Sequence, residues 1–118
     1  SFHVTGVQTC ALPIYLGKLE LRVGTIVLAE DFPEAKKPAY KLIIDFGTQG
    51  KKCSSAQITK NYSVDELPGH QVIAVFNLGK KKIGPFTSEV LVMGAEDKNG
   101  NIVLLKPDGN IHNGALVN

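Results

Sequence analysis

Three consecutive lysines, Lys80–Lys82, stand in a loop between two apolar stretches of the chain. Asn77, Gly79, Gly84 and Pro85 surround them, and residues of these types interrupt regular structure. A rigid apolar scaffold that presents a cationic loop is suited to binding a polyanion. The alternative is a solvated lysine surface, which is the commoner meaning of a charge run taken alone.

The positive charge is concentrated in the middle of the chain. The formal net charge is +2 over 118 residues. Residues 46–88 contain six lysines against two acids, whereas residues 89–118 contain two lysines against four acids. Residues 15–45 balance at five basic and five acidic side chains. The overall charge is too mild to indicate a partner, but this distribution favours a polyanionic partner near the lysine loop.

Alternating apolar residues predict the strands that must position this loop. Leu19–Val27 alternates at period two, with Gly24 marking a bend. Tyr40–Phe46 repeats the pattern, and after a hairpin turn Lys51–Ala56 returns as a third strand. Gln71–Ala95 supplies two more strands, which the lysine loop joins.

A break in the alternation separates the third and fourth strands. There Ser63 precedes Asp65 and Glu66, which favours the start of a short helix, and Pro68 ends it. Five strands with a bent first strand, and a short helix between strands three and four, describe an all-β OB-fold. This fold is a five-stranded Greek-key barrel.

The predicted barrel would bring lysines from separate elements to one side. In an OB-fold, ligands lie across strands two and three, flanked by the loops that join strands one to two and four to five. We predict that the lysines of these strands and loops contact nucleic-acid phosphates. They are Lys41, Lys51 and Lys52 on the strands, and Lys36, Lys37, Lys80, Lys81 and Lys82 in the loops.

Several ordered motifs resemble the tRNA-binding domain family. They are LELRVGTIVLAEDFPEA, LIIDFG, SSAQIT and VIAVFNLGKKKIGPFTSEVLVMGA, and they cover roughly residues 16–118. The Pro38-Ala39 insertion and the SSAQIT segment resemble the CsaA branch of that family. The tRNA-binding relatives usually have SEGM where residues 88–91 are Ser-Glu-Val-Leu. The resemblance implies a non-catalytic OB-fold homodimer that binds tRNA or another structured RNA, or unfolded export-substrate peptides in a chaperone-like activity.

By position, the resemblance adds five residues to the candidate RNA-contacting set. From the residues alone, Ser54 and Ser55 can instead be edge-strand filler, and the asparagine is more often a turn residue at a strand end. The glutamate is equally well a partner of Arg22 or a lysine that fixes the loop. The five are Ser54, Ser55, Asn77, Ser88 and Glu89.

Two aromatic residues could stack on bases, and three functions fit the resemblance. Phe86 and Tyr40 are candidates for stacking on bases, but the parity of Tyr40 with Leu42 places Tyr40 in the core. The first function is a tRNA-binding module. The alternatives are a peptide-binding chaperone with no physiological RNA ligand and an accessory docking domain of a tRNA synthetase.

Several other chemistries have no support in the sequence. His70 and His112 have no partner at metal-ligand spacing, and no Ser-His-acid or Cys-His set is suggested. We therefore expect no metal, no cofactor and no catalytic activity. No apolar run approaches the length of a membrane span, and two cysteines are too few for a disulfide framework. We expect a cytoplasmic protein with no membrane partner.

The two ends of the chain differ from the middle. Val4–Ile14 matches, residue for residue, a common short-read sequencing adapter translated in one frame. We expect residues 1–14 to be a non-native leader and residues 15–118 to be the OB-fold domain. The alternative is a genuine disordered or edge-strand terminus. The polar tail, Asn110–Asn118, is expected to have few anchors.

Overall fold

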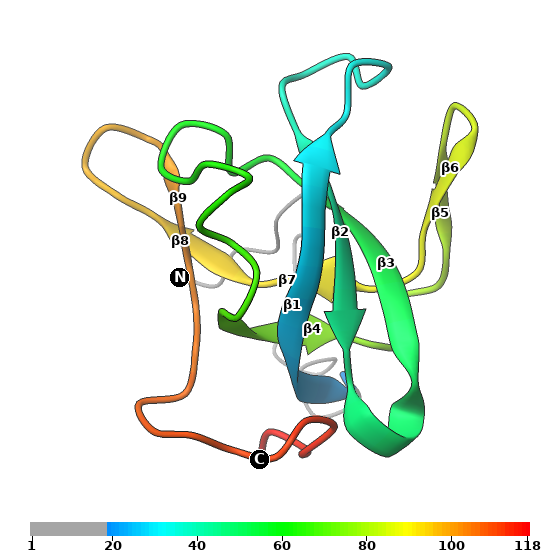
Figure 1. Ribbon diagram of the computed structural model, residues 1–118, viewed down its shortest axis with the longest axis vertical. Helices are drawn as coiled ribbons and strands as arrows, with labels where there is room; N and C mark the ends of the chain where they lie inside the picture. The colour runs from blue at the N-terminus through cyan, green and yellow to red at the C-terminus, as the bar shows by residue number, and fades with distance from the viewer. Residues whose placement is uncertain (1–18) are drawn as a thin grey trace.

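Residues 19–118, which a computed structural model describes, are built from short antiparallel strands (Figure 1). Five of these strands form one sheet in the order β3-β2-β1-β4-β7, and the pairs β5–β6 and β8–β9 form separate two-stranded sheets. The elements are β1 (Leu21–Asp31), β2 (Tyr40–Asp45), the 3-10 turn η1 (Gly47–Gln49), β3 (Lys51–Ala56), β4 (Gln71–Val75), β5 (Lys81–Ile83), β6 (Phe86–Ser88), β7 (Leu91–Val92), β8 (Gly94–Glu96) and β9 (Ile102–Leu104).

Strand β1 bends so that its two halves serve different neighbours. The first half pairs with β4 from Leu21 to Thr25, and the second half pairs with β2 from Thr25 to Asp31, with a register shift between Ile26 and Leu28. A Cβ atom at Gly24 would lie 2.6 Å from the Phe46 ring. The glycine therefore lets the buried ring approach β1 at the point where the strand changes partners.

The two edges of the five-stranded sheet meet, so the barrel is nearly closed. The backbone N–H groups of Glu89 and Val90, just before β7, donate to the carbonyl of Cys53 in β3 at 2.8 and 3.3 Å. This closure removes exposed strand edges, as in other small β-barrels. The prediction of an all-β, five-stranded OB-like barrel is confirmed.

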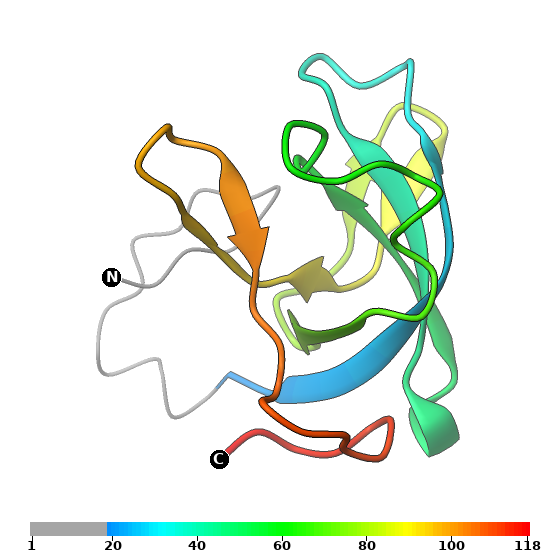
Figure 2. The same cartoon turned by 60° about the vertical axis from the view of Figure 1, so that its left-hand side comes forward.

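The C-terminal tail is anchored more firmly than its polar sequence suggests. The N–H of Val23 donates to Ala115 O at 3.0 Å, Gly114 N donates to Val23 O at 2.7 Å, and Val117 N donates to Leu21 O at 2.8 Å. The tail thus runs along the start of β1 (Figure 2). The expectation of few anchors is wrong. Backbone hydrogen bonds hold the tail, and the polarity of its side chains does not reveal them.

The predicted helix between the third and fourth strands is absent, and turns take its place. The capping signal does form, since Ser63 N donates to Glu66 Oε1 at 2.8 Å and Glu66 N donates to Ser63 O at 3.3 Å. Ile58 and Leu67, on either side, are fully buried and pin the segment to the barrel. Pro68 then prevents a second turn, so the cost of nucleating a helix is not recovered.

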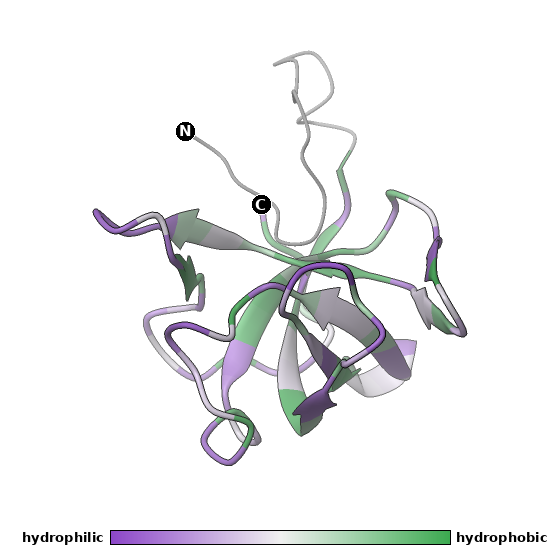
Figure 3. Cartoon of the chain, turned by 90° about the horizontal axis from the view of Figure 1, so that it is seen from above, coloured by the Kyte–Doolittle hydropathy of each residue, from purple (hydrophilic) through white to green (hydrophobic). Residues whose placement is uncertain are grey.

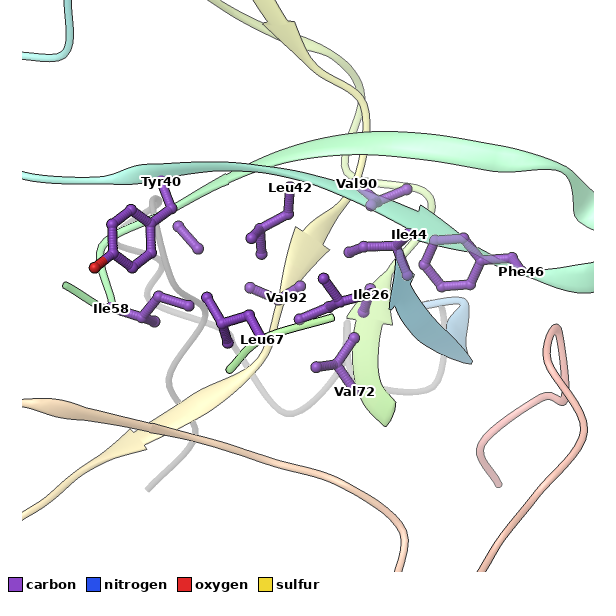
Figure 4. Close-up of a cluster of buried hydrophobic side chains, with 12 residues drawn as sticks. Ile26, Tyr40, Leu42, Ile44, Phe46, Ile58, Leu67, Val72, Val90 and Val92 are labelled. Carbon is purple, nitrogen blue, oxygen red and sulfur yellow. The ribbon is translucent and has the colours of Figure 1, made fainter. Parts of the chain in front are cut away.

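The two small hairpins leave the barrel on opposite sides (Figure 3). Between them lies the core, a cluster of inward-facing side chains from the five strands (Figure 4). Tyr40 belongs to this cluster, as its parity with Leu42 predicts. Its hydroxyl donates to the carbonyl of Tyr62 at 2.8 Å, and burial raises the pKa of this phenol.

The predicted leader, residues 1–14, lies outside the described residues. Among residues 19–118, no helix is long and apolar enough to cross a membrane.

Candidate nucleic-acid interface

The loop between β1 and β2 packs against the β5–β6 hairpin. Phe32 of the loop and Phe86 of β6 meet edge to face, with ring centroids 5.2 Å apart and planes at 64°. Lys41 Nζ lies 5.0 Å from the Phe32 centroid and 5.7 Å from the Phe86 centroid. We call Phe32, Lys41 and Phe86 the latch. It joins two elements that rise from the same end of the barrel (Figure 1).

The lysine loop is itself a hairpin. Lys80 directly precedes β5, and Lys81 and Lys82 lie in β5 opposite Ser88 and Thr87 of β6. All three lysines are exposed. The tip of the hairpin is the Gly84 turn, so the lysines lie along its first strand and not in an irregular loop as the sequence predicts. Because side chains alternate along a strand, Lys81 and Lys82 face opposite sides.

The β1–β2 loop carries a mixture of charges. Lys36 and Lys37 are exposed, but residues 30–41 hold three acids as well as three lysines. Lys41 Nζ lies 4.0 Å from Glu34 Oε1. Net positive charge at this end of the barrel therefore comes from the β5–β6 hairpin.

Lys51 and Lys52 lie at the other end of the β2–β3 pair. They are opposite Asp45 and Ile44, next to η1, whereas Ser55 is opposite Lys41. Ser55 is four positions after Lys51 along β3, which corresponds to roughly 13 Å. In Figure 1 the β1–β2 loop and the β5–β6 hairpin both point upward, whereas the β2–β3 turn lies at the bottom. Lys36, Lys37, Lys41 and the hairpin lysines therefore belong to one end, and Lys51 and Lys52 belong to the opposite end.

The candidate serines are buried and bonded inside the protein. Ser54 pairs with Leu42 on the inner face of the barrel and has no exposed surface. The N–H of Ser55 donates to Ser88 Oγ at 3.1 Å, and Ser88 Oγ donates to the carbonyl of Val90 at 3.2 Å. These contacts attach the base of the β5–β6 hairpin to β3. A direct RNA contact by these serines stays a prediction.

Glu89 and Asn77 also bond to the backbone. Glu89 Oε1 accepts from Cys53 N at 3.1 Å, and burial together with this carboxylate raises the pKa of the Cys53 thiol. The alternative of a Glu89–Arg22 pair does not form, because Arg22 Nε donates to Glu20 Oε2 at 2.6 Å. Asn77 Oδ1 accepts from Glu20 N at 2.8 Å and so holds the chain after β4.

Two features of this end of the molecule were not predicted. Phe32 was not singled out, although a lone aromatic residue inside a charged, proline-containing loop signals a packing contact. Leu28, Ile43 and Cys53 form a cross-strand row on the outer face of β1, β2 and β3, with Leu28 44% exposed. This apolar row could have been found by continuing the period-two pattern outward.

No metal centre is present in the described part of the chain. Among residues 19–118, no three His, Cys, Asp or Glu side chains lie together in a way that could hold an ion. His70 packs its ring against Tyr62 at 6.2 Å.

The comparison with known proteins decides the family. Residues 21–116 match the family described as "Putative tRNA binding domain". The chain belongs to the tRNA-binding domain family. Val90 and Leu91, where the relatives usually have glycine and methionine, are both buried, so this departure lies beneath the surface.

Within this family, solved CsaA proteins are similar over their whole length. The CsaA chaperone of Bacillus anthracis is 44% identical with a TM-score of 0.84, covering 93% of this chain and 100% of that chain. The CsaA chaperone of Picrophilus torridus is 48% identical with a TM-score of 0.83, covering 92% of this chain and 99% of that chain. The resemblance to the CsaA branch is therefore confirmed.

Larger enzymes contain a similar segment. The methionine–tRNA ligase of Methanocaldococcus jannaschii is 40% identical over 103 residues, which cover 87% of this chain but only 16% of the ligase. The chain thus spans a small part of the curated ligases that it matches. The shared segment belongs to a family of binding domains, and the domain itself is not catalytic.

Proposed function

We propose that this domain binds tRNA through the lysines of the β5–β6 hairpin. The observation that carries the proposal is the placement of Lys80–Lys82, exposed on a hairpin that packs against the β1–β2 loop. This end of the barrel adjoins the outer face of β2 and β3, where OB-folds hold oligonucleotides. The family match and the likeness to a methionine–tRNA ligase support tRNA as the RNA.

Binding would depend on phosphate contacts and shape. Lysine ammonium groups act on phosphates as point charges, without selecting a base. Lys81 and Lys82 face opposite sides of the hairpin, so a hairpin lying in an RNA groove would meet both phosphate strands. The apolar row Leu28, Ile43 and Cys53 offers a surface on which an unstacked base could lie.

The test removes the hairpin charge and compares the salt dependence of tRNA binding. The salt slope is the amount by which log K falls per unit rise in log salt. Each lost phosphate contact lowers this salt slope by about 0.7–0.9. We expect the triple change Lys80→Ala, Lys81→Ala and Lys82→Ala to lower the slope by about 2 and to weaken binding at least tenfold at low salt. The measurement is a filter-binding titration at several salt concentrations.

A matched control removes the same charge elsewhere. Lys60, Lys98 and Lys106 are exposed and lie in the β3–β4 segment, in the β8–β9 turn and after β9. Their triple alanine variant should keep the wild-type slope within about 0.5. Equal losses in the two variants would mean that overall charge attracts the RNA, and the proposed site would be abandoned.

A second function, binding of unfolded peptides, is favoured by the similarity to CsaA chaperones and by exposed Val27 and Leu28 on β1. An apolar surface would hold peptides at high salt, where tRNA binding is lost. Peptide binding that vanishes with salt would count against this function.

We also propose a homodimer in the cytoplasm, which sedimentation equilibrium tests through the mass of the particle. Docking onto a synthetase stays an alternative.

A further inference from the structure

We propose that Lys41 is a positioning residue, whose ammonium group fixes the β5–β6 hairpin against the β1–β2 loop and does not contact RNA phosphate. The functional half of this inference depends on the proposed tRNA binding, whereas the structural half does not. It changes the role that the sequence predicts for Lys41.

The surroundings of Lys41 differ from those of the other candidate lysines. Its side chain is only 25% exposed, and its Nζ lies near the rings of both Phe32 and Phe86. A cation over two aromatic rings is attracted by the negative faces of both. Glu34, at 4.0 Å, balances the charge. The ammonium group therefore has its partners within the protein.

The hairpin needs such a contact to keep one orientation. Each of its strands has three residues, and the pair forms a sheet separate from the barrel. An isolated two-stranded hairpin is marginally stable in water. Gly79 precedes it with φ 84°, a conformation that glycine adopts readily.

Two sets of contacts hold the hairpin. At its base, Ser88 bonds to Ser55 of β3. Further out, at the residue that pairs with Ile83, Phe86 enters the latch. With the base contact alone the hairpin could rotate about its base. The second contact fixes the angle at which Lys80–Lys82 meet a ligand.

The consequence is a preorganised binding element. Without the latch, the hairpin would sample several orientations, and binding would have to order it again. The same lysines would still meet the same phosphates in the complex. Affinity would therefore fall while the salt slope stayed constant, because the slope counts phosphate contacts.

The test compares Lys41→Met, which keeps the unbranched stem but removes the charge, with Lys41→Arg, which keeps a cation above the rings. The first measurement is hydrogen exchange in the free full-length chain. Lys41→Met and Phe86→Leu should each speed exchange of the β5 and β6 amides at least fivefold and leave the β1 and β4 amides unchanged. Lys41→Arg should keep wild-type exchange. Lys36→Met, which removes an exposed lysine of the β1–β2 loop, is the charge-matched control and should also keep wild-type exchange.

The second measurement is tRNA affinity against salt. Lys41→Met should weaken binding about fivefold with no change in slope, whereas Lys80→Ala should lower the slope by about 0.7–0.9 with no change in hydrogen exchange. Combining Lys41→Met with Phe86→Leu should weaken binding no more than either change alone, since both break one latch.

Two results would overturn the proposal. One is unchanged hairpin exchange in Lys41→Met, which would mean that no latch exists. The other is a salt slope that falls in Lys41→Met as it does in Lys80→Ala, which would make Lys41 a phosphate ligand. If the wild-type chain binds no tRNA at all, the proposed function fails, and hydrogen exchange still decides whether the latch exists.

Discussion

Replacing Ser88 by alanine separates a structural from an RNA-binding role for this residue. The side chain is 1% exposed, and its hydroxyl both accepts from Ser55 N and donates to Val90 O. Alanine removes the hydroxyl and leaves both of these backbone groups buried without that partner. We therefore expect Ser88→Ala to destabilise the fold and to loosen the base of the β5–β6 hairpin.

The magnitude follows from these two bonds. A buried polar group that loses its partner costs about 1–3 kcal/mol. Because Val90 O can find a second donor more readily than Ser55 N can find a second acceptor, we expect a total of about 2–3 kcal/mol. For a domain of this size, that corresponds to a fall in Tm of roughly 8–15 °C.

The assay is urea unfolding followed by circular dichroism, with a thermal melt of the same samples. Thr87→Ala is the control, because Thr87 is the exposed neighbour on the same strand, and it should change the free energy of unfolding by less than about 0.5 kcal/mol. A Ser88→Ala protein as stable as wild type, with weaker tRNA binding, would refute this reasoning. It would make the hydroxyl an RNA contact.

Three further predictions concern stability and reactivity. Gly24→Ala should lower the free energy of unfolding by about 1–3 kcal/mol in the same urea assay, because its methyl group would lie 2.6 Å from the Phe46 ring; an unchanged midpoint would show that the ring moves aside. The Cys53 thiol, whose pKa burial raises, should react with iodoacetamide about tenfold more slowly at pH 8 than it does in the urea-unfolded chain, and equal rates would contradict this. The pKa of Asp97 is lowered, chiefly by the backbone N–H of Asn101. Its contribution to stability is therefore present above its ordinary pKa and lost as the pH falls through the lowered value, so Asp97→Asn should flatten the decline of the urea midpoint between about pH 5 and pH 2.

Local patterns accounted for most of the barrel. Strand parity placed Tyr40 and Leu42 in the core because successive side chains of a strand face opposite sides whatever the rest of the chain does. The helix prediction was wrong because the path of that segment depends on contacts distant in the sequence. Ser63 and Glu66 make the expected capping bond, but burial of Ile58 and Leu67 decides the path of the segment, and burial depends on the whole fold.

The candidate site shows the same division. Composition and loop position were enough to single out Lys80–Lys82 as a cationic element. They could not show that Ser54 faces the core, because the parity of β3 depends on its register with β2. They also could not show that Ser88 and Glu89 bond to β3, since these residues meet only when the barrel closes.

The sequence by itself determined an all-β barrel with a basic element between its last strands, because period-two alternation and runs of charge are properties of neighbouring residues. Only the tertiary structure decided which lysines lie together. It places the Lys41 ammonium group near the rings of both Phe32 and Phe86 and leaves Lys51 at the opposite end of the β2–β3 pair. The physical reason is the curl of β1 and the register of β2 and β3, which bring residues distant in the chain into contact and separate others that are close to them in sequence.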